Sequence, residues 1–299
     1  MHIYTFQNKW DYELIDSGNG KRLERWGKYI LSRPDPQAIW TPHAHENEWL
    51  ASDAIFDSKW HIRTNVTQPW TVTWPLPLGP KQAVTGNWDL NLIARLSSFK
   101  HTGVFAEQAA NWEWLAEQTQ NGKWKVKNEK PRILNLFGYT GAATVLLAKL
   151  GCFVTHVDAS KPTIGWAKEN QAANRLPEDS IRWILDDCVK FVKREVKRGA
   201  LYDGIILDPP AYGHTPGGQT WKFGEGLPDL LSLCDQLLSP TAKFILVNAY
   251  ATNTSSIALQ NVLEDTIKKT RTTIEVGELC LEQRDHRILS TGIVARCSR

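Results

Sequence analysis

The sequence is poor in cysteine and has no long apolar run. Its five cysteines are widely separated and form no C-x-x-C pair: Cys152, Cys188, Cys234, Cys280 and Cys297. This spacing argues against a disulfide scaffold and a zinc site, and it suits a reducing cytoplasm. The N-terminal stretch "MHIYTFQNKWDYELIDSG" has no apolar core of signal-peptide length. Apolar runs such as "TVLLAKL" are too short to span a bilayer, so we expect a soluble, intracellular protein without a metal.

The net charge also excludes few classes of protein. Over 299 residues, 42% hydrophobic and 22% charged residues with a net charge of +3 are ordinary for a globular protein. The basic residues gather in two clusters, which are Lys123, Lys125, Lys127, Lys130 and Arg132, and then Lys190, Lys193, Arg194, Lys197 and Arg198. Both clusters are compatible with solvated faces and with a nucleic-acid surface.

The composition changes along the chain, which predicts two domains. Residues 1–95 contain short strand-like runs punctuated by prolines and by the turn residues Gly18, Asn19 and Gly20. Eleven of the 14 tryptophans precede Lys125, and they suit either a small core or a stacking surface. We expect residues 1–95 to form a β-rich domain that binds the substrate.

Residues 96–299 alternate between apolar strand-like runs and helical patterns. Strands are expected at 132–137, 153–158, 181–185, 202–208 and 243–250, with helices between them and two more strand candidates at 273–280 and 291–296. Such alternation is typical of an α/β fold with a doubly wound, Rossmann-like and mostly parallel sheet.

The first strand–helix turn of this region has the features of a nucleotide site. In "NLFGYTGAAT", Gly138 and Gly141 permit a tight turn and a close approach of the backbone to a ligand. Asp158 ends the next strand about 20 residues after Gly138, where a carboxylate can bind both ribose hydroxyls. The third strand ends at Asp186 and Asp187, and we expect Asp187, with the Cys188 backbone, to accept from an adenine amino group.

The fourth strand leads into "DPPAYG", which indicates a methyl acceptor rather than a hydride acceptor. The full G-x-G-x-x-G of dinucleotide oxidoreductases is missing from the first turn. Pro209 and Pro210 form a rigid wall, because proline fixes φ. Asp208 can accept from an amino group, and Tyr212 can stack on a flat ring. Together they would orient an acceptor for in-line transfer.

These runs, with "HVDAS" and "NQAAN", resemble the class I S-adenosylmethionine-dependent methyltransferases over roughly residues 95–299. The chain is similar, more narrowly, to the bacterial large-subunit rRNA methyltransferases that include the cytosine-C5 enzymes, although it lacks their PUA domain. The stretch "FKHTGVFAEQAANW" is similar to that group's K-T-G-x-F-x-D-Q motif. The resemblance implies S-adenosylmethionine as cofactor, bound by Lys100, Phe105, Gln108, Phe137, Gly138, Tyr139, Gly141, Asp158, Ala159, Ser160, Asp187, Cys188 and Asp208.

One departure from this group bears on the chemistry. Cytosine-C5 enzymes add a cysteine thiolate to the base, and in them that cysteine follows the fifth strand. The equivalent run here, "LVNAYATNTSS", contains no cysteine. We therefore expect a nitrogen or oxygen acceptor, with Asp208 as general base or orienting group and no covalent intermediate.

The predicted function is methyl transfer to a base in rRNA, in the cytoplasm. A methyltransferase that acts on a protein or a small molecule remains an alternative, and so does a non-catalytic scaffold that binds S-adenosylmethionine. The loop with His214 and Lys222 is either a lid or a flexible connection. Arg284 and His286 are candidate contacts for a phosphate. His43 and His45 have no third ligand nearby in sequence, which disfavours a metal.

Overall fold

The computed structural model describes residues 2–76, 89–120, 130–214, 220–269 and 273–299. The chain divides into two compact units, each discontinuous in sequence. The first unit comprises Met1–Ile3, Trp114–Glu278 and Gly292–Arg299, and the second comprises Tyr4–Glu113 and Leu279–Thr291. The expected assignment of separate roles to residues 1–95 and 96–299 stays a prediction.

The first unit is organised around a large sheet. In spatial order its strands are β1 (His2–Tyr4), β16 (Thr273–Glu282), β17 (Ile288–Ser298), β15 (Phe244–Ala249), β12 (Gly204–Leu207), β9 (Arg132–Leu136), β10 (Phe153–Asp158) and β11 (Ile181–Leu185). The division between the units falls within β1, β16 and β17. Strands β9, β10, β11, β12 and β15 pair in parallel, and β17 pairs antiparallel with β15. The predicted doubly wound fold with a β-rich N-terminal region is confirmed.

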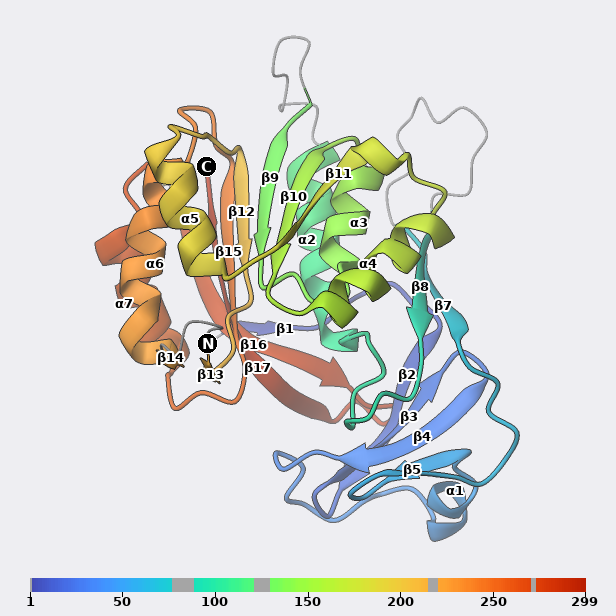
Figure 1. Ribbon diagram of the computed structural model, residues 1–299. Coiled ribbons are helices and arrows are strands. Elements are labelled where there is room, and N and C mark those ends of the chain that lie inside the picture. Colours follow the sequence, from blue (N-terminus) through green and yellow to red (C-terminus); the bar gives the residue numbers. More distant parts are fainter. Residues whose placement is uncertain (1, 77–88, 121–129, 215–219, 270–272) are drawn as a thin grey trace. The chain divides into compact units, whose positions relative to one another are not determined.

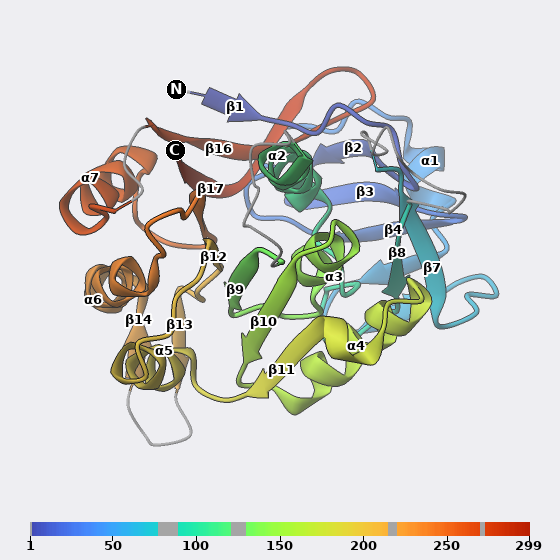
Figure 2. The ribbon, with the colours of Figure 1, turned by 90° about the horizontal axis from the view of Figure 1, so that it is seen from above.

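The parallel strands form because both of their faces are covered. Every residue of β12 and β15 is buried, as expected for apolar runs at the centre of an α/β sheet. Helices α3 (Ala142–Lys149) and α4 (Lys161–Ala173) lie on one face. Helices α5 (Cys188–Lys197), α6 (Phe223–Leu237) and α7 (Ser256–Thr266) lie on the other (Figures 1 and 2).

Local sequence sets the starts of three of these helices. The hydroxyl of Ser160 caps α4 by accepting from the Thr163 amide, and Ser255 caps α7 in the same way through the Ala258 amide. Asp187 caps α5. A side-chain oxygen at this position satisfies an amide that has no partner within the helix. Three helices that follow parallel strands therefore begin where the sequence supplies a hydroxyl or a carboxylate.

Shorter elements complete the chain. In the first unit they are the antiparallel strands β13 (Tyr212–His214) and β14 (Thr220–Lys222), which pair through three residues each, and the 3-10 turn Glu178–Ser180. In the second unit they are the 3-10 turn Ala106–Gln108 and helix α1 (Glu46–Leu50). Helix α2 (Ala109–Gln120) contains the division between the units.

The second unit is rich in antiparallel strands. One sheet contains, in order, β2 (Tyr12–Gly18), β3 (Lys21–Trp26), β4 (Tyr29–Pro34), β5 (Ala54–Phe56) and β6 (Trp60–Ile62), and a second pairs β7 (Trp70–Trp74) with β8 (Leu90–Ala94). The β2–β3 turn uses Asn19 and Gly20, both at positive φ, as hairpin turns of this kind require.

Several of the tryptophans fill the core of this second unit. Trp26 and Trp74 are fully buried, and Trp112 is 1% exposed. Trp112 makes edge-to-face contacts with Trp10 and Trp74, with ring centroids 5.7 Å apart in each pair. Such contacts are the preferred geometry for aromatic rings. The tryptophan-rich composition of the N-terminal region thus serves core packing at these positions.

A buried ionic cluster lies beside these rings. The carboxylate of Glu24, which is 0% exposed, accepts from Arg33 at 2.5 and 3.1 Å and from the Tyr12 hydroxyl at 2.8 Å. Arg22 lies 3.4 Å from the same carboxylate. Burial alone would raise the pKa of Glu24, but Arg22 and Arg33 outweigh it and lower the pKa to about 2. The carboxylate is therefore charged and fully paired.

Candidate active site

The strand order of the first unit reverses at β9. Strands β10 and β11 lie on one side of β9, and β12 and β15 lie on the other. Because all five run parallel, their carboxyl ends meet at one edge. In open α/β sheets, ligands bind beyond this edge at the point where the order reverses. The candidate site is therefore built from the turns that follow β9, β10, β11 and β12.

The turn after β9 has an unusual backbone. Phe137, Tyr139 and Gly141 all have positive φ, at 56°, 50° and 77°. Gly138 lies against the buried His156 ring, and a Cβ at Gly138 would come within 2.4 Å of the His156 Cε1 atom. Only glycine fits there without displacing the ring. Gly138 therefore lets the turn pack closely on His156, and the predicted approach of a ligand to this backbone stays a prediction.

Asp158, at the end of β10, holds this turn in place. Its Oδ2 atom accepts from the Tyr139 amide at 2.9 Å. Its Oδ1 atom accepts from the Ser160 amide at 2.8 Å and from the Thr163 hydroxyl at 3.1 Å. A carboxylate offers about four acceptor positions, so Oδ2 keeps one for a further donor such as a ribose hydroxyl. Asp158 is half-buried and can serve both purposes.

The two acids after β11 have different partners. Asp187 caps α5 through its Oδ1 atom, which accepts from the Lys190 amide at 2.8 Å. Asp186 forms an ion pair with Arg194, and its amide donates to the Asp158 carbonyl at 3.1 Å. Asp186 is therefore committed to a cation, whereas Asp187 interacts with a backbone amide. This favours Asp187 over Asp186 as an acceptor for a ligand.

Cys188 connects the strand ends through its buried sulfur. Its Sγ atom accepts from the Phe137 amide at 3.2 Å, and the thiol donates to the Val157 carbonyl at 3.7 Å. Burial raises the pKa of this thiol, which therefore stays protonated. The side chain of Cys188 is a packing and tethering group beneath the turn.

The segment "DPPAY" adjoins the first turn directly. The Asp208 amide donates to the Leu136 carbonyl at 3.3 Å, which joins the end of β12 to the end of β9. Pro209 is buried and Pro210 is exposed. Tyr212 is 56% exposed and begins β13. The structure brings Asp208 and both prolines to the same edge as Phe137, Gly138 and Tyr139.

Trp221 also lies at this end of the sheet, although it is not among the site residues predicted from the sequence. Its Nε1 atom donates to the Pro210 carbonyl at 2.7 Å, and its ring centroid lies 5.8 Å from that of Phe137. A Cβ at Gly226 would come within 2.5 Å of the indole. The sequence signal for this contact is a tryptophan followed five residues later by a glycine, Trp221 and Gly226. This pattern is too short and too common to predict a site.

The loop after "DPPAYG" is partly a hairpin. Tyr212 pairs with Lys222, and Gly213 pairs with Trp221. Residues 215–219 lie outside the described residues, so the choice between a lid and a flexible connection stays a prediction. The basic residues Lys123, Lys125 and Lys127 also lie outside the described residues.

Lys100, Phe105 and Gln108 belong to the second unit. The Lys100 ammonium donates to the Pro34 carbonyl at 3.3 Å, and burial lowers its pKa. The Phe105 ring lies 5.1 Å from the His101 ring. Gln108 accepts from the Asn111 side chain at 2.9 Å. Their predicted contacts with a cofactor stay predictions.

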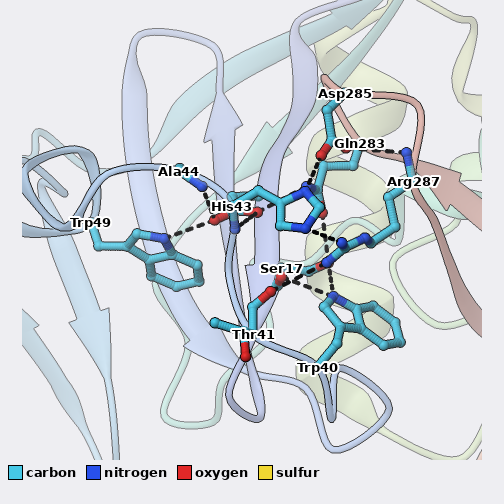
Figure 3. A network of polar contacts seen from close by, with 10 residues as sticks. Ser17, Trp40, Thr41, His43, Ala44, Trp49, Gln283, Asp285 and Arg287 are labelled. Atoms are coloured by element: carbon cyan, nitrogen blue, oxygen red, sulfur yellow. Dashed lines mark hydrogen bonds and ion pairs between the residues drawn. The ribbon is translucent and has the colours of Figure 1, made fainter.

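His43, one of the two histidines considered as ligands, has side-chain partners within the second unit. His43 lies 2.6 Å from Asp285 through its Nδ1 atom, and Arg287 contacts its other ring nitrogen (Figure 3). In the part of the chain that the structure describes, there is no group of three or more metal-ligating side chains.

Arg284 and His286, the candidate phosphate contacts, are paired with acids. Arg284 donates to Glu13 at 2.9 Å and to Glu48 at 3.2 Å. His286 lies 2.6 Å from Glu282. Both side chains therefore already contact carboxylates, and a phosphate at either one would have to displace a carboxylate.

The five cysteines are all buried. Burial raises the pKa of Cys152 to about 12 and also raises the pKa of Cys234. A thiolate nucleophile requires a lowered pKa and access to the substrate. All five thiols are buried, and the pKa values of Cys152, Cys188 and Cys234 are raised rather than lowered.

Comparison with known proteins adds independent information. No family model matches the sequence. The ribosomal RNA large subunit methyltransferase K/L of Shewanella sp. (strain MR-4) is 28% identical over 170 residues, which is 56% of this chain and 23% of that protein. The chain thus spans less than a quarter of the length of such curated relatives.

Two solved structures cover nearly the whole chain. A SAM-dependent methyltransferase from Agrobacterium tumefaciens is 36% identical, with a TM-score of 0.86, and the match covers 100% of this chain and 93% of that one. The structure of SMU.776 with SAH is 15% identical, with a TM-score of 0.70, over 96% and 75% of the two chains. The second likeness shows the fold alone. Among the described residues, no helix is long and apolar enough to cross a membrane.

Proposed function

Because the chain belongs to the S-adenosylmethionine-dependent methyltransferases, we propose that it transfers a methyl group from this cofactor to a base in ribosomal RNA. The proposal rests on the position of the Asp208–Pro210 corner, the segment that follows β12. The Asp208 amide donates a hydrogen bond to the Leu136 carbonyl at the end of β9. An acceptor held there would meet a cofactor bound over the Phe137–Gly141 turn. The curated relatives that match half of the chain support rRNA as the acceptor, and rRNA would place the reaction in the cytoplasm.

The residues of the first unit fit the cofactor. The backbone of the Phe137–Gly141 turn would border the methionine part, and Gly138 lets this turn pack closely on the buried His156 ring. The free acceptor position of Asp158 suits a ribose hydroxyl, and the second carboxylate oxygen of Asp187 suits the adenine amino group. Ala159, Ser160 and the Cys188 backbone would border the adenosine.

When bound, S-adenosylmethionine supplies an electrophilic methyl group, whose bond to sulfur breaks as its bond to the acceptor atom forms. Asp208 would accept a hydrogen bond from the acceptor's amino group and take the proton that this group loses. Such positioned proton transfer contributes about 10² to 10⁴ in rate. Pro209 and Pro210 fix the corner, and the exposed ring of Tyr212 would stack on the base.

The burial of the cysteines supports a mechanism without a covalent intermediate. Carbon 5 of cytosine needs a thiolate for activation, whereas a nitrogen lone pair needs only orientation and removal of a proton. The protonated, buried state of Cys152, Cys188 and Cys234 favours the second kind of acceptor.

The decisive experiment compares modified nucleosides in rRNA from a strain that lacks the gene with those from its parent. We expect one methylated nucleoside to disappear in the deletion strain. The purified protein with tritiated S-adenosylmethionine should restore it on rRNA from that strain. Transfer of the label to a protein or a small-molecule fraction, with unchanged rRNA, would replace RNA by one of those acceptors. Cofactor binding without transfer to any fraction would indicate a scaffold.

A further inference from the structure

A cavity adjoins the candidate active site on the α5–α6 face of the first unit. It has a volume of about 450 Å³, and it is lined by residues of α5, β14 and α6 that include Asp187, Lys190, Lys193, Trp221, Leu230 and Leu233. Figures 1 and 2 show these three elements side by side. The volume lies within the range of about 300 to 1,000 Å³ typical of small-molecule sites. The cavity is large enough for one nucleotide.

Trp221 gives this cavity a rigid aromatic surface. The bond from its Nε1 atom to the Pro210 carbonyl, its contact with Phe137 and the close approach of Gly226 restrict the indole. The ring is nevertheless half-exposed. Stacking of a base on such an aromatic ring is worth about 1 to 3 kcal/mol and tolerates any base.

The rim of the cavity continues as a stripe of lysines along α5. Lys190, Lys193 and Lys197 are exposed and lie three and four residues apart, so they share one face of the helix. Arg194 and Arg198 are paired with Asp186 and Glu195, but no described residue forms an ion pair with the three lysines. Asp229, also on the rim, is the one acid of α6 that lines the cavity.

The position of Lys190 also indicates an anionic partner. Lys190 lies in the first turn of α5, where the helix dipole is positive and a cation is unfavourable. A phosphate at this point would relieve that repulsion and accept from the lysine. S-adenosylmethionine carries no phosphate, and its one carboxylate belongs to the methionine part, which we place at the Phe137–Gly141 turn rather than at these lysines.

We propose that the cavity and the α5 lysine stripe bind a nucleotide of the RNA substrate that neighbours the methylated one. Its base stacks on Trp221, and its phosphate and the next ones lie along Lys190, Lys193 and Lys197. This inference rests on the proposed function and extends it by naming the surface that holds the RNA. The substrate strand then runs from the Asp208 corner across Trp221 and along α5.

The test measures RNA affinity by filter binding at several salt concentrations and cofactor affinity by calorimetry. We compare Lys193→Glu with Lys168→Glu, because Lys168 is an exposed lysine on α4, on the opposite face of the sheet. Lys193→Glu should weaken RNA binding at least tenfold and make the log–log salt slope less negative by roughly 0.7 or more. Lys168→Glu should change neither quantity, and both variants should bind the cofactor like the wild type.

Trp221→Ala and the milder Trp221→Phe test the stacking contact. Trp221→Ala should weaken RNA binding roughly tenfold, and Trp221→Phe should restore most of it. If wild type methylates RNA but the Lys193 and Lys168 variants bind RNA alike, this inference fails and the proposed function stands. If wild type neither binds nor methylates RNA, both fail. Loss of cofactor affinity in Trp221→Phe, with RNA affinity unchanged, would assign the cavity to the cofactor and overturn the inference.

Discussion

The acids at the strand ends of the first unit and the acid at the centre of the second unit differ in their partners. Glu24 is fully buried, and its carboxylate forms ion pairs with the guanidinium groups of Arg22 and Arg33. Asp158 and Asp187 are half-buried and accept from amides and a hydroxyl. A carboxylate enclosed by cations stabilises one conformation, whereas a carboxylate with acceptor positions left open can recognise a ligand.

Three core tryptophans of the second unit also differ from Trp221 of the first unit, because they are more fully buried. Trp26, Trp74 and Trp112 of the second unit are buried among other rings. Trp221 of the first unit is held at its edge and still half-exposed. The comparison predicts that changes in the first unit alter activity more than stability, and that changes at Glu24 do the opposite.

The largest effect is expected at Asp208. Asp208→Asn keeps the size of the side chain but removes the group that takes a proton, so methyl transfer should fall about 10² to 10⁴-fold. Calorimetry should show cofactor affinity and thermal stability close to those of the wild type. A variant with full activity would remove Asp208 from the chemistry and leave the proline corner as a purely geometric element.

Glu24→Gln should cause the largest loss of stability. It leaves Arg33 buried without a counter-charge and Arg22 with Asp35 alone, which costs about 3 to 5 kcal/mol in the free energy of unfolding. Urea titration measures this loss. Cofactor affinity, referred to the folded fraction, should not change.

The pH dependence of stability isolates the charge on Glu24. Since its pKa is lowered from 4.5 to about 2 in the folded state, its contribution is complete above the unfolded pKa and is lost as pH falls towards 2. The difference in stability between wild type and Glu24→Gln should therefore shrink between about pH 4.5 and pH 2. Parallel curves for the two proteins would show that this carboxylate is not ionised as described.

Gly138→Ala should have an intermediate effect in the first unit. The new Cβ would meet the His156 ring at 2.4 Å, and overpacking of this kind costs about 1 to 3 kcal/mol. The shifted turn should also weaken cofactor binding. Gly165→Ala in α4 is the matched control, because nothing lies within 4 Å of its Cβ, and it should stabilise the helix by about 0.5 to 1 kcal/mol.

The smallest effect is expected for the cysteines. Replacing Cys152, Cys234, Cys280 or Cys297 by alanine should leave methyl transfer within a few-fold of the wild type, because buried thiols have no access to the substrate. Cys188→Ala should lower stability through its contact with Phe137. A folded variant that binds cofactor but has lost all transfer would falsify the non-covalent mechanism.

Much of the first unit followed from the sequence. The strand–helix alternation predicted the parallel sheet, and the family and the cofactor are confirmed by the structural relative. Motif residues such as Gly138, Asp158 and Asp208 lie at the end of a strand or within two residues of it. In a parallel sheet, that position places a residue at the edge where ligands bind, and the roles of these residues there stay predictions.

The features that escaped prediction depend on contacts between distant parts of the chain. The return of Leu279–Thr291 to the second unit depends on pairs such as Ser17 with Gln283, which lie 266 residues apart. The role of Trp221 depends on a bond to Pro210 and on the space left by Gly226. No local periodicity marks such partners, since burial and pairing are decided only when the strands are assembled.

A crystal structure with S-adenosylhomocysteine tests the central claim most directly. We expect the adenine beside Asp187, the ribose hydroxyls on Asp158, and the sulfur over the Phe137–Gly141 turn, facing Asp208 and Pro209. The ligand bound elsewhere, or in this turn with its sulfur directed away from Asp208, would contradict the account.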